Sequence, residues 1–386
     1  MKVAFYLAHP AHYHYYKYTA QQLRNDGHEV TYIIKAKDVL LDLLNGDNET
    51  YHIVAVKRPK NKWERITFVM QANWKIIKLL RHEKIDMIIG SQFSAGIRLL
   101  TRSTIISTAE DDAAILGIYP KIVYPFSHAI VCSTKCDIGQ WNKKAVKFES
   151  NMKIGYIHPN NFMSSKEICV KYNIDTQKSY FIMRFAQLNA HHDGGIKGIN
   201  TDIAQRLIDI LSPHGQVYIT SERELEPQFE PYRLAINPID MHHVMAFASL
   251  YIGDSQTMAA EAGILGVPYV RFNGFVGRIG YLDELETKYQ LGVGIRPEKK
   301  KAENDIPLQT PYPVLHWGEE AMYDIVSQLV QDLPKVKAEW AEKRTRLLSE
   351  KIDYAKFLTW FIENYPDSQQ QTRDNQQNNA FWARFK

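Results

Sequence analysis

The chain has 386 residues, enough for two or three domains, and its 45% hydrophobic and 23% charged residues are typical of a globular protein. A net charge of +4 is too small to indicate nucleic-acid binding. No apolar stretch reaches the roughly 20 residues of a membrane span. Cys132, Cys136 and Cys169 follow no disulfide or metal-binding pattern. We therefore expect reduced thiols in a cytoplasmic protein without a metal.

The first part of the chain predicts an alternating α/β domain. The apolar run over 3–7 is typical of a buried parallel strand, and a helix over 14–25 and a strand over 30–34 should follow it. Further strands are expected over 52–56, 85–90, 104–107, 122–126 and 129–133.

The loop after the first predicted strand is a candidate site, because ligands bind at the carboxyl ends of the strands in such sheets. It carries His9 and His12. Imidazole is suited to general-base work, since its ordinary pKa is near 6.5. Alternatively, these side chains cap the helix or pack under nearby tyrosines.

A second candidate follows the strand over 104–107, where Glu110, Asp111 and Asp112 are consecutive. Neighbouring carboxylates repel one another, so a cation, a basic partner or proton transfer would explain them. The alternative is the N-terminus of a helix over 113–116, where acidic residues are favoured.

The segment 57–84 is unusually basic, with nine Lys and Arg residues against Glu64 and Glu83. Trp63 and Trp74 are interleaved with these charges. A basic helix with tryptophans could lie on an anionic membrane. The alternative is a packed helix with a solvated face.

The first domain should occupy residues 1–160 and the second residues 161–333. In the second domain, a strand over 180–184 leads into a long glycine-rich loop that carries Asn189, and Arg184 ends that strand. A loop of this kind at the end of a strand is a candidate ligand site.

A strand over 217–220 is followed by Ser221 and Arg223, which are further candidates for ligand contact. The C-terminal part should form helices over 319–333 and 336–365. We expect the segment 334–365 to return to the first domain. Residues 366–386 are rich in Gln and Asn and are expected to be disordered, although the chain ends in FWARFK.

The stretch 251–271 predicts a strand, a polar turn, a helix and a second strand. Ser255, Gln256 and Thr257 are turn and N-cap residues, and Gly266 is in the position of a helix stop. The N-terminus of a helix at the carboxyl edge of a sheet binds phosphate. Ser255 could equally be an ordinary cap.

Glu261 lies about one turn into this helix. Its carboxylate could accept two hydrogen bonds from a ribose diol. The alternative is a buried structural partner for an arginine, with Arg271 and Arg278 as candidates.

The pattern of Ser255, Glu261 and Gly266-x-Pro268 resembles the donor-site helix of GT-B glycosyltransferases and of UDP-N-acetylglucosamine 2-epimerases. The resemblance implies that the turn holds a diphosphate and that Glu261 holds the ribose. Over roughly residues 1–330 the chain also resembles the domain of unknown function 354 family. The motifs that carry this likeness are AHPAHYHYYK, TAEDDA, GYIHPNNF, RFAQLNAHHDGGIKGI, ITSERELEPQFEPYRL and YIGDSQTMAAEAGILGVP.

These resemblances imply an α/β, GT-B-like fold of two Rossmann-like domains whose parallel sheets face each other across a cleft. The implied function is a glycosyltransferase of surface or capsular polysaccharide biosynthesis. A UDP-linked sugar is the substrate, no cofactor is expected, and a glycan or lipid-linked compound is the acceptor. Arg184 or Arg223 would contact the phosphates.

His9 or His12 would deprotonate the acceptor. One alternative is a UDP-sugar 2-epimerase in which Glu110 and Asp111 handle protons. Another is a non-catalytic sugar-nucleotide-binding protein. The oligomeric state is left open.

Overall fold

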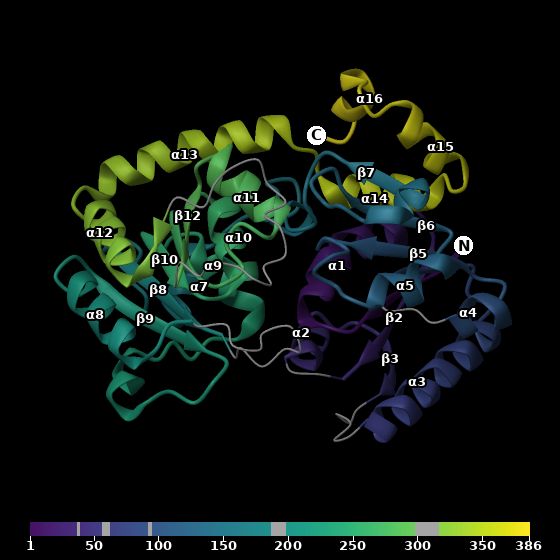
Figure 1. Cartoon of the computed structure of the whole chain (residues 1–386), viewed down its shortest axis with the longest axis horizontal. Coiled ribbons are helices and arrows are strands. Elements are labelled where there is room, and N and C mark those ends of the chain that lie inside the picture. The colour runs from purple at the N-terminus through teal and green to yellow at the C-terminus, as the bar shows by residue number, and fades with distance from the viewer. Residues whose placement is uncertain (37–38, 56–61, 92–94, 187–197, 298–315) are drawn as a thin grey trace. The chain divides into compact units, whose positions relative to one another are not determined.

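The computed structural model describes the chain except for residues 37–38, 56–61, 92–94, 187–197 and 298–315. It divides into two compact units (Figure 1). The first unit consists of Met1–Asn161 and Lys351–Lys386, and the second of Phe162–Glu350.

The first unit is built on a seven-stranded parallel sheet with the order β3-β2-β1-β4-β5-β6-β7. Its strands are β1 (Lys2–Leu7), β2 (Glu29–Lys35), β3 (Tyr51–Ala55), β4 (Met87–Gly90), β5 (Thr104–Ala109), β6 (Ala129–Ser133) and β7 (Ala145–Phe148). Its helices are α1 (Pro10–Asn25), α2 (Leu40–Gly46), α3 (Lys62–His82), α4 (Ala95–Leu100), α5 (Tyr119–Val123), α6 (Ile154–Ile157), α14 (Tyr354–Glu363), α15 (Asp367–Asp374) and α16 (Asn379–Ala383), with 3-10 turns η1 (Tyr124–Phe126) and η2 (Gly139–Lys144).

Helices cover both faces of this sheet. On one face, Ile77 of α3, Ile97 of α4 and Val123 of α5 join Ala4 and Tyr6 of β1 in one apolar core. On the other face, α1 packs against β1 and β2, and α14 packs against α1 (Figure 1). The strand order explains this division, because right-handed crossovers that run in opposite directions along a sheet place their helices on opposite faces.

The strand predicted over 122–126 is wrong. That segment forms the end of α5 and η1, with Pro120 in the first turn of α5 and Pro125 in η1. Proline lacks the N–H that a central strand donates but fits the first turn of a helix. The sheet is completed instead by β7, whose four residues give no clear signal in the sequence.

The second unit contains a six-stranded parallel sheet with the order β13-β12-β11-β10-β8-β9. Its strands are β8 (Tyr180–Phe185), β9 (Gln216–Ser221), β10 (Leu250–Gly253), β11 (Tyr269–Phe272), β12 (Gly292–Arg296) and β13 (His316–Trp317). Its helices are α7 (Lys166–Lys171), α8 (Thr201–Leu211), α9 (Met241–Met245), α10 (Gln256–Leu265), α11 (Gly280–Thr287), α12 (Gly318–Val330) and α13 (Leu333–Glu350), with 3-10 turns η3 (Pro227–Tyr232) and η4 (Pro238–Asp240).

The predicted caps of α10 are confirmed. Ser255 is the N-cap, and Gly266 is the C-cap with a left-handed φ of 86°, which glycine adopts without steric cost. Gly253, just before the helix, permits a close approach of β8. A Cβ at this position would lie 2.6 Å from the Tyr251 Oη and 2.9 Å from the carbonyl oxygen of Arg184.

The C-terminal part differs from the prediction in two respects. The helix expected over 336–365 is interrupted, so that α13 ends the second unit and α14 belongs to the first. Asp353 caps α14 by accepting the N–H of Ala355 at 2.9 Å. Residues 366–386, expected to be disordered, form α15 and α16.

Aromatic packing explains why this tail is ordered. Phe385 is 2% exposed, and its ring lies 5.4 Å from Phe357 and 5.2 Å from Trp360. Trp382 lies 5.6 Å from Phe357. Aromatic side chains bury enough area to outweigh the polar composition of the preceding residues.

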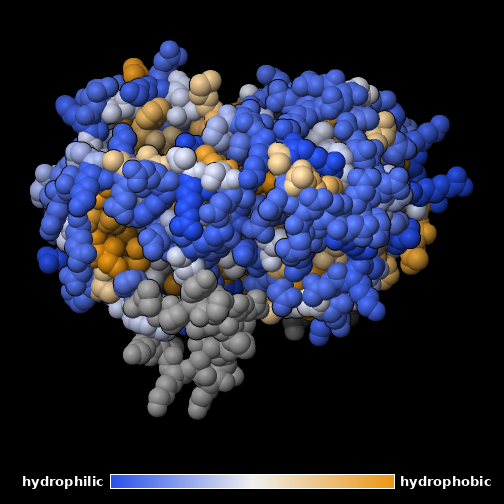
Figure 2. Space-filling model, turned by 90° about the horizontal axis from the view of Figure 1, so that it is seen from above, coloured by the Kyte–Doolittle hydropathy of each residue, from blue (hydrophilic) through white to orange (hydrophobic). Residues whose placement is uncertain are grey.

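Each sheet contributes buried apolar side chains to a core, and hydrophilic residues predominate on the face shown in Figure 2. Apolar residues appear on that face only in separate patches. Within the described residues, no helix combines the length and the apolar character needed to cross a bilayer.

Candidate functional site

The strand order of the first sheet reverses between β1 and β4, and ligands bind at such a switch point, beyond the carboxyl ends of the strands. His9 is the N-cap of α1, directly after β1, and His12 lies in the first turn of that helix. Ser91 follows β4, and its Oγ lies 3.5 Å from the Nε2 of His12. Both histidines therefore lie at the edge where a ligand is expected.

Backbone contacts determine which imidazole nitrogen of His9 and of His12 carries the proton. The N–H of Ala8 donates to the Nδ1 of His12 at 3.3 Å, and the N–H of Ala11 donates to the Nδ1 of His9 at 3.2 Å. Because a backbone N–H can only donate, Nδ1 must be unprotonated in both rings. A neutral ring then carries its proton on Nε2. In this tautomer each Nε2 can donate a hydrogen bond but cannot accept a proton, which a general base must do.

Glu110 lies directly after β5, and two side chains hold its carboxylate. The Nζ of Lys153 and the Oη of Tyr15 each donate to it, at 2.5 Å. The Lys153 side chain is fully buried, and a buried lysine requires a counter-charge. The helix expected over 113–116 is absent, because residues 113–118 form turns. A basic partner, rather than a helix N-terminus, therefore accounts for Glu110.

The two carboxyls that follow have raised pKa values. Burial, together with the neighbouring charge of Glu110, raises the pKa of Asp111 to about 6, and Lys153 opposes the effect. Burial raises the pKa of Asp112 to about 6, although the N–H of Asp137 donates to its Oδ1 at 2.5 Å. Groups with pKa values near the ambient pH are suited to proton transfer.

In the second unit, the strand order reverses between β8 and β10, and Asp254 anchors the turn that follows β10. Its carboxylate oxygens accept the N–H of Ala186 at 2.6 Å and the N–H of Ile199 at 3.3 Å. The Nδ2 of Asn273 donates to its carbonyl oxygen at 2.8 Å. These bonds tie together the segments that follow β8, β10 and β11. Burial raises the pKa of Asp254 to about 6.

Ser255, Gln256 and Thr257 start α10 at this same edge. The Ser255 Oγ accepts the N–H of Met258 at 3.5 Å. The other first-turn N–H groups have no partners within the helix, and the positive end of the helix dipole lies here. The Oε1 of Gln256 is a buried acceptor without a partner among the described residues. Asn189, also predicted to contact a ligand, lies outside the described residues.

The two predicted phosphate-binding arginines lie at the ends of β8 and β9. The Nη2 of Arg184 donates to Glu222 at 2.6 Å, and the Nη2 of Arg223 donates to the carbonyl oxygen of Ile199 at 2.9 Å. Ser221 closes a local turn by donating to the carbonyl oxygen of Arg223 at 2.7 Å. The Nε of each arginine is buried and has no hydrogen-bond partner among the described residues. Both guanidinium groups thus keep donor capacity beside the switch point.

Glu261 is 4% exposed, and α10 packs against α9. Its Oε1 lies 3.2 Å from the Nε2 of His242 on α9. Arg271, a predicted alternative partner, donates instead to Glu286, from Nε at 2.9 Å and from Nη2 at 3.1 Å. The structure therefore assigns Glu261 a histidine partner that the sequence did not indicate.

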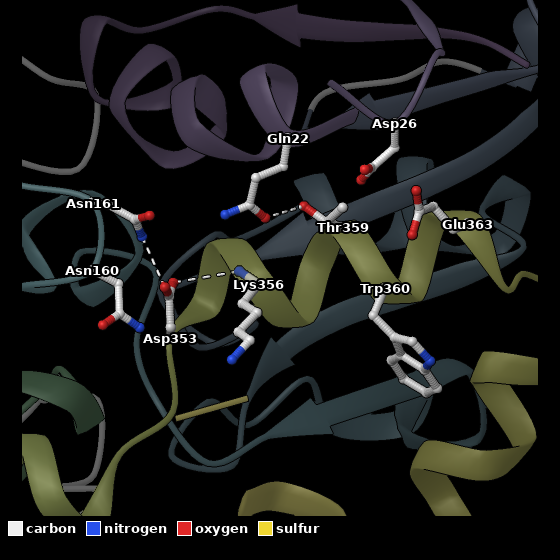
Figure 3. A pocket seen from close by; sticks show the side chains of 9 residues that line it. All are labelled: Gln22, Asp26, Asn160, Asn161, Asp353, Lys356, Thr359, Trp360 and Glu363. Carbon is white, nitrogen blue, oxygen red and sulfur yellow. Dashed lines mark hydrogen bonds between the residues drawn. The ribbon is translucent and has the colours of Figure 1, made fainter. Parts of the chain in front are cut away.

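A polar pocket of about 440 Å³ lies elsewhere in the first unit, along the contact of α1 with α14 (Figure 3). The Oγ1 of Thr359 donates to the Oε1 of Gln22 at 2.8 Å, and the Nδ2 of Asn161 donates to Asp353 at 2.9 Å. Gln22 is roughly 18 Å along α1 from its first residue. The pocket is therefore separate from the carboxyl edge that carries His9.

Sequence reasoning missed the partners Tyr15, Lys153 and His242. Tyr15 and Lys153 lie 95 and 43 residues from Glu110 in the chain, so no spacing rule connects them. A lysine within the apolar stretch NMKIGYI was the available signal for Lys153, since lysines are rarely buried unless paired.

No family model matches this chain, and no curated protein matches its sequence. The resemblance to the domain of unknown function 354 family is therefore not supported by a family match. Solved structures are similar over nearly the whole chain. MnaA of S. aureus, determined with UDP, has a TM-score of 0.61 at 12% identity and covers 95% of this chain and 97% of its own.

Two further structures match in the same way. Spinosyn forosaminyltransferase SpnP has a TM-score of 0.58 at 13% identity and covers 94% of this chain and 98% of its own. UDP-GlcNAc 2-epimerase from Neisseria meningitidis, bound to UDP-GlcNAc, has a TM-score of 0.58 at 12% identity and covers 96% of this chain and 100% of its own.

The chain has a GT-B fold. The predicted fold class, with two α/β units that each contain a parallel sheet, is confirmed. The GT-B fold supports both sugar transfer and sugar epimerisation among these neighbours. The fold by itself therefore does not decide between these two chemistries.

Proposed function

We propose that this GT-B chain is a glycosyltransferase that uses a nucleotide sugar with UDP as the nucleotide. The turn from β10 into α10 carries the proposal. Asp254 fixes this turn by two backbone hydrogen bonds, and Arg184 and Arg223 lie at the ends of the neighbouring strands. A helix N-terminus flanked by guanidinium groups suits a diphosphate. Likeness to structures bound to UDP and to UDP-GlcNAc supports the choice of nucleotide.

The first unit would supply the groups that activate the acceptor, a glycan or lipid-linked hydroxyl compound. Asp111 is the proposed general base. With a pKa of about 6 it is ionised at neutral pH and still basic enough to accept a proton. The acceptor oxygen bonds to the anomeric carbon as its proton passes to the Asp111 carboxylate. The bond from that carbon to the diphosphate breaks, and its electron pair leaves on the diphosphate.

His9 and His12 take a different role in this proposal. With Nδ1 occupied by a backbone N–H, each imidazole would donate from Nε2 to a substrate oxygen. A cytoplasmic role in surface or capsular polysaccharide biosynthesis is part of the same proposal.

The test is a screen of UDP and UDP-sugars by thermal shift, followed by a UDP-release assay with and without acceptors. A ligand at 100 times its Kd stabilises by about 2.7 kcal/mol, which is readily measured. We expect Arg223→Ala to weaken UDP binding, and Lys178→Ala, at a side chain that is 82% exposed, to leave binding unchanged. The absence of a shift with every UDP ligand, for a folded protein, would refute the proposal.

An epimerase is the second candidate, and the acidic cluster in the first unit favours it. Asp111 and Asp112 have pKa values of about 6, so each can take up and release protons near neutral pH. Epimerisation at C2 breaks a C–H bond and needs no acceptor. Incubation of UDP-GlcNAc with the enzyme alone in D2O would then yield an isomer with deuterium at C2. UDP affinity without turnover in either assay would indicate a non-catalytic binding protein.

A further inference from the structure

Exposed apolar side chains are concentrated in one part of the first unit. In the described part of the chain, seven of the twelve large apolar side chains that are exposed lie between residues 69 and 122. They are Val69, Met70 and Trp74 on α3, Leu99 and Leu100 on α4, and Ile118 and Ile122 at α5. Met70, Trp74, Leu99 and Ile118 are 62–75% exposed.

These three helices lie on the same face of the sheet. Their inner residues belong to one apolar core, α3 packs against α4, and α4 packs against η1, which continues α5. Figure 1 shows all three on one side of the first unit. Their outer residues therefore form one surface, here called the α3–α5 surface, defined by the seven apolar side chains above.

On α3 the exposed residues follow the helical repeat. Met70, Trp74 and Lys78 are four residues apart, so they form one stripe on the outer side. Ile76 and Leu80 lie on the inner side and are 1% and 2% exposed. Exposed apolar side chains on the outside of a helix that already buries its other face in a core are typical of a binding surface for another molecule or a membrane.

The charged side chains described on these three helices have one sign. The side chains described on α3, α4 and α5 include five cations and no carboxylate. The cations are Lys75, Lys78, Arg81, Arg98 and Lys121, and all five are exposed. Residues 57–66, which carry five further basic residues of the predicted segment, lie outside the side chains that the structure describes.

We propose that the α3–α5 surface docks onto an anionic lipid bilayer. Tryptophan, methionine and branched aliphatic side chains enter the boundary between headgroups and acyl chains, while lysine and arginine contact anionic headgroups. A second copy of the chain is a poorer occupant, because a two-fold contact would set the same five cations against each other. The inference does not depend on the proposed activity, although a lipid-linked acceptor would be found at such a membrane.

Vesicle flotation tests this proposal, with phosphatidylcholine vesicles and with vesicles that also contain phosphatidylglycerol. One variant, Met70→Ser/Trp74→Ser, removes the apolar stripe, and another, Lys75→Glu/Lys78→Glu, reverses two charges. Met163→Ser and Lys178→Glu are matched controls, because these side chains in the second unit are 86% and 82% exposed. Circular dichroism melts establish that each variant is folded.

We expect the wild type to float with anionic vesicles. The apolar variant should lose at least tenfold in partitioning. The charge variant should lose at least about fivefold for each reversed charge, and both controls should keep wild-type binding. Quenching of tryptophan fluorescence by brominated lipid should disappear in Trp74→Phe.

Three results would overturn the proposal. The first is that the wild type floats with neither kind of vesicle. The second is that the two control variants lose as much vesicle binding as the apolar and charge variants. The third is a dimer in light scattering that the apolar variant converts to a monomer without a change in flotation. That outcome would assign the surface to a second copy of the chain.

Discussion

Glu261 has two candidate roles in the second unit, a structural contact with His242 and a contact with the ribose of the nucleotide. Glu261→Gln removes the charge and keeps an acceptor for the Nε2 of His242, which lies 3.2 Å from the carboxylate. Glu261→Ala removes both. Since the carboxylate is 4% exposed and lies on the helix whose N-terminus is the proposed diphosphate site, the two variants report on different properties.

The expected magnitudes follow from this geometry. Removal of the Glu261 carboxylate leaves the buried Nε2 of His242 without this contact, which costs about 1–3 kcal/mol. In a unit of this size, 1 kcal/mol corresponds to about 2–4 °C in Tm. Glu261→Ala should therefore lower Tm by about 2–12 °C, and Glu261→Gln by much less. If the carboxylate also binds a ribose diol, loss of its charge removes charge-assisted hydrogen bonds worth about 1.5–3 kcal/mol each. Glu261→Gln should then weaken UDP binding tenfold or more.

The assay is isothermal titration with UDP together with a calorimetric melt on the same samples. Glu286→Gln is the matched control, because the Glu286 side chain is only 10% exposed and is held by Arg271. It should lower Tm without a comparable loss of UDP affinity. An unchanged UDP affinity in Glu261→Gln would refute the ribose contact, and an unchanged Tm in Glu261→Ala would refute the structural pair.

Three further predictions concern the first unit. The folded-state pKa of Asp111, about 6, exceeds the ordinary value of an aspartate. The stability contributed by its protonated form is therefore fully present below about pH 4 and is lost as the pH rises through about 6. Asp111→Asn should therefore stabilise the fold above pH 6 by up to about 3 kcal/mol, measured as a higher Tm, and should lower UDP release by about a hundredfold or more because it removes the proposed general base; a lower Tm at pH 8 would contradict the burial argument. Lys153→Met should lower Tm by several degrees in calorimetry, because it leaves Glu110 without its basic partner, and the double variant with Glu110→Gln should recover most of the loss; no recovery would refute the pairing. Phe385→Ala should cost about 3–5 kcal/mol in denaturant unfolding, and unchanged stability would mean that the C-terminal tail is not docked.

Local signals in the sequence determined much of the fold. Continuous apolar runs marked β1, β4 and β8, because a strand that is buried on both faces needs no polar alternation. Ser255 and Gly266 marked the caps of α10, because cap chemistry depends on a few adjacent residues. The sequence also placed His9 and Glu110 each after the end of a predicted strand.

Tertiary structure alone decided how those residues are paired and protonated. Lys153 reaches Glu110, and His242 reaches Glu261, across 43 and 19 residues of chain, and no periodicity encodes such distances. The Nδ1 contact of His12 depends on the backbone of Ala8, and the raised pKa of Asp111 depends on burial. Composition predicted disorder for 366–386, because composition carries no information about the packing of Phe385 against the aromatic side chains of α14. Elements follow from neighbouring residues, whereas contacts, charge states and docking follow from packing between distant ones.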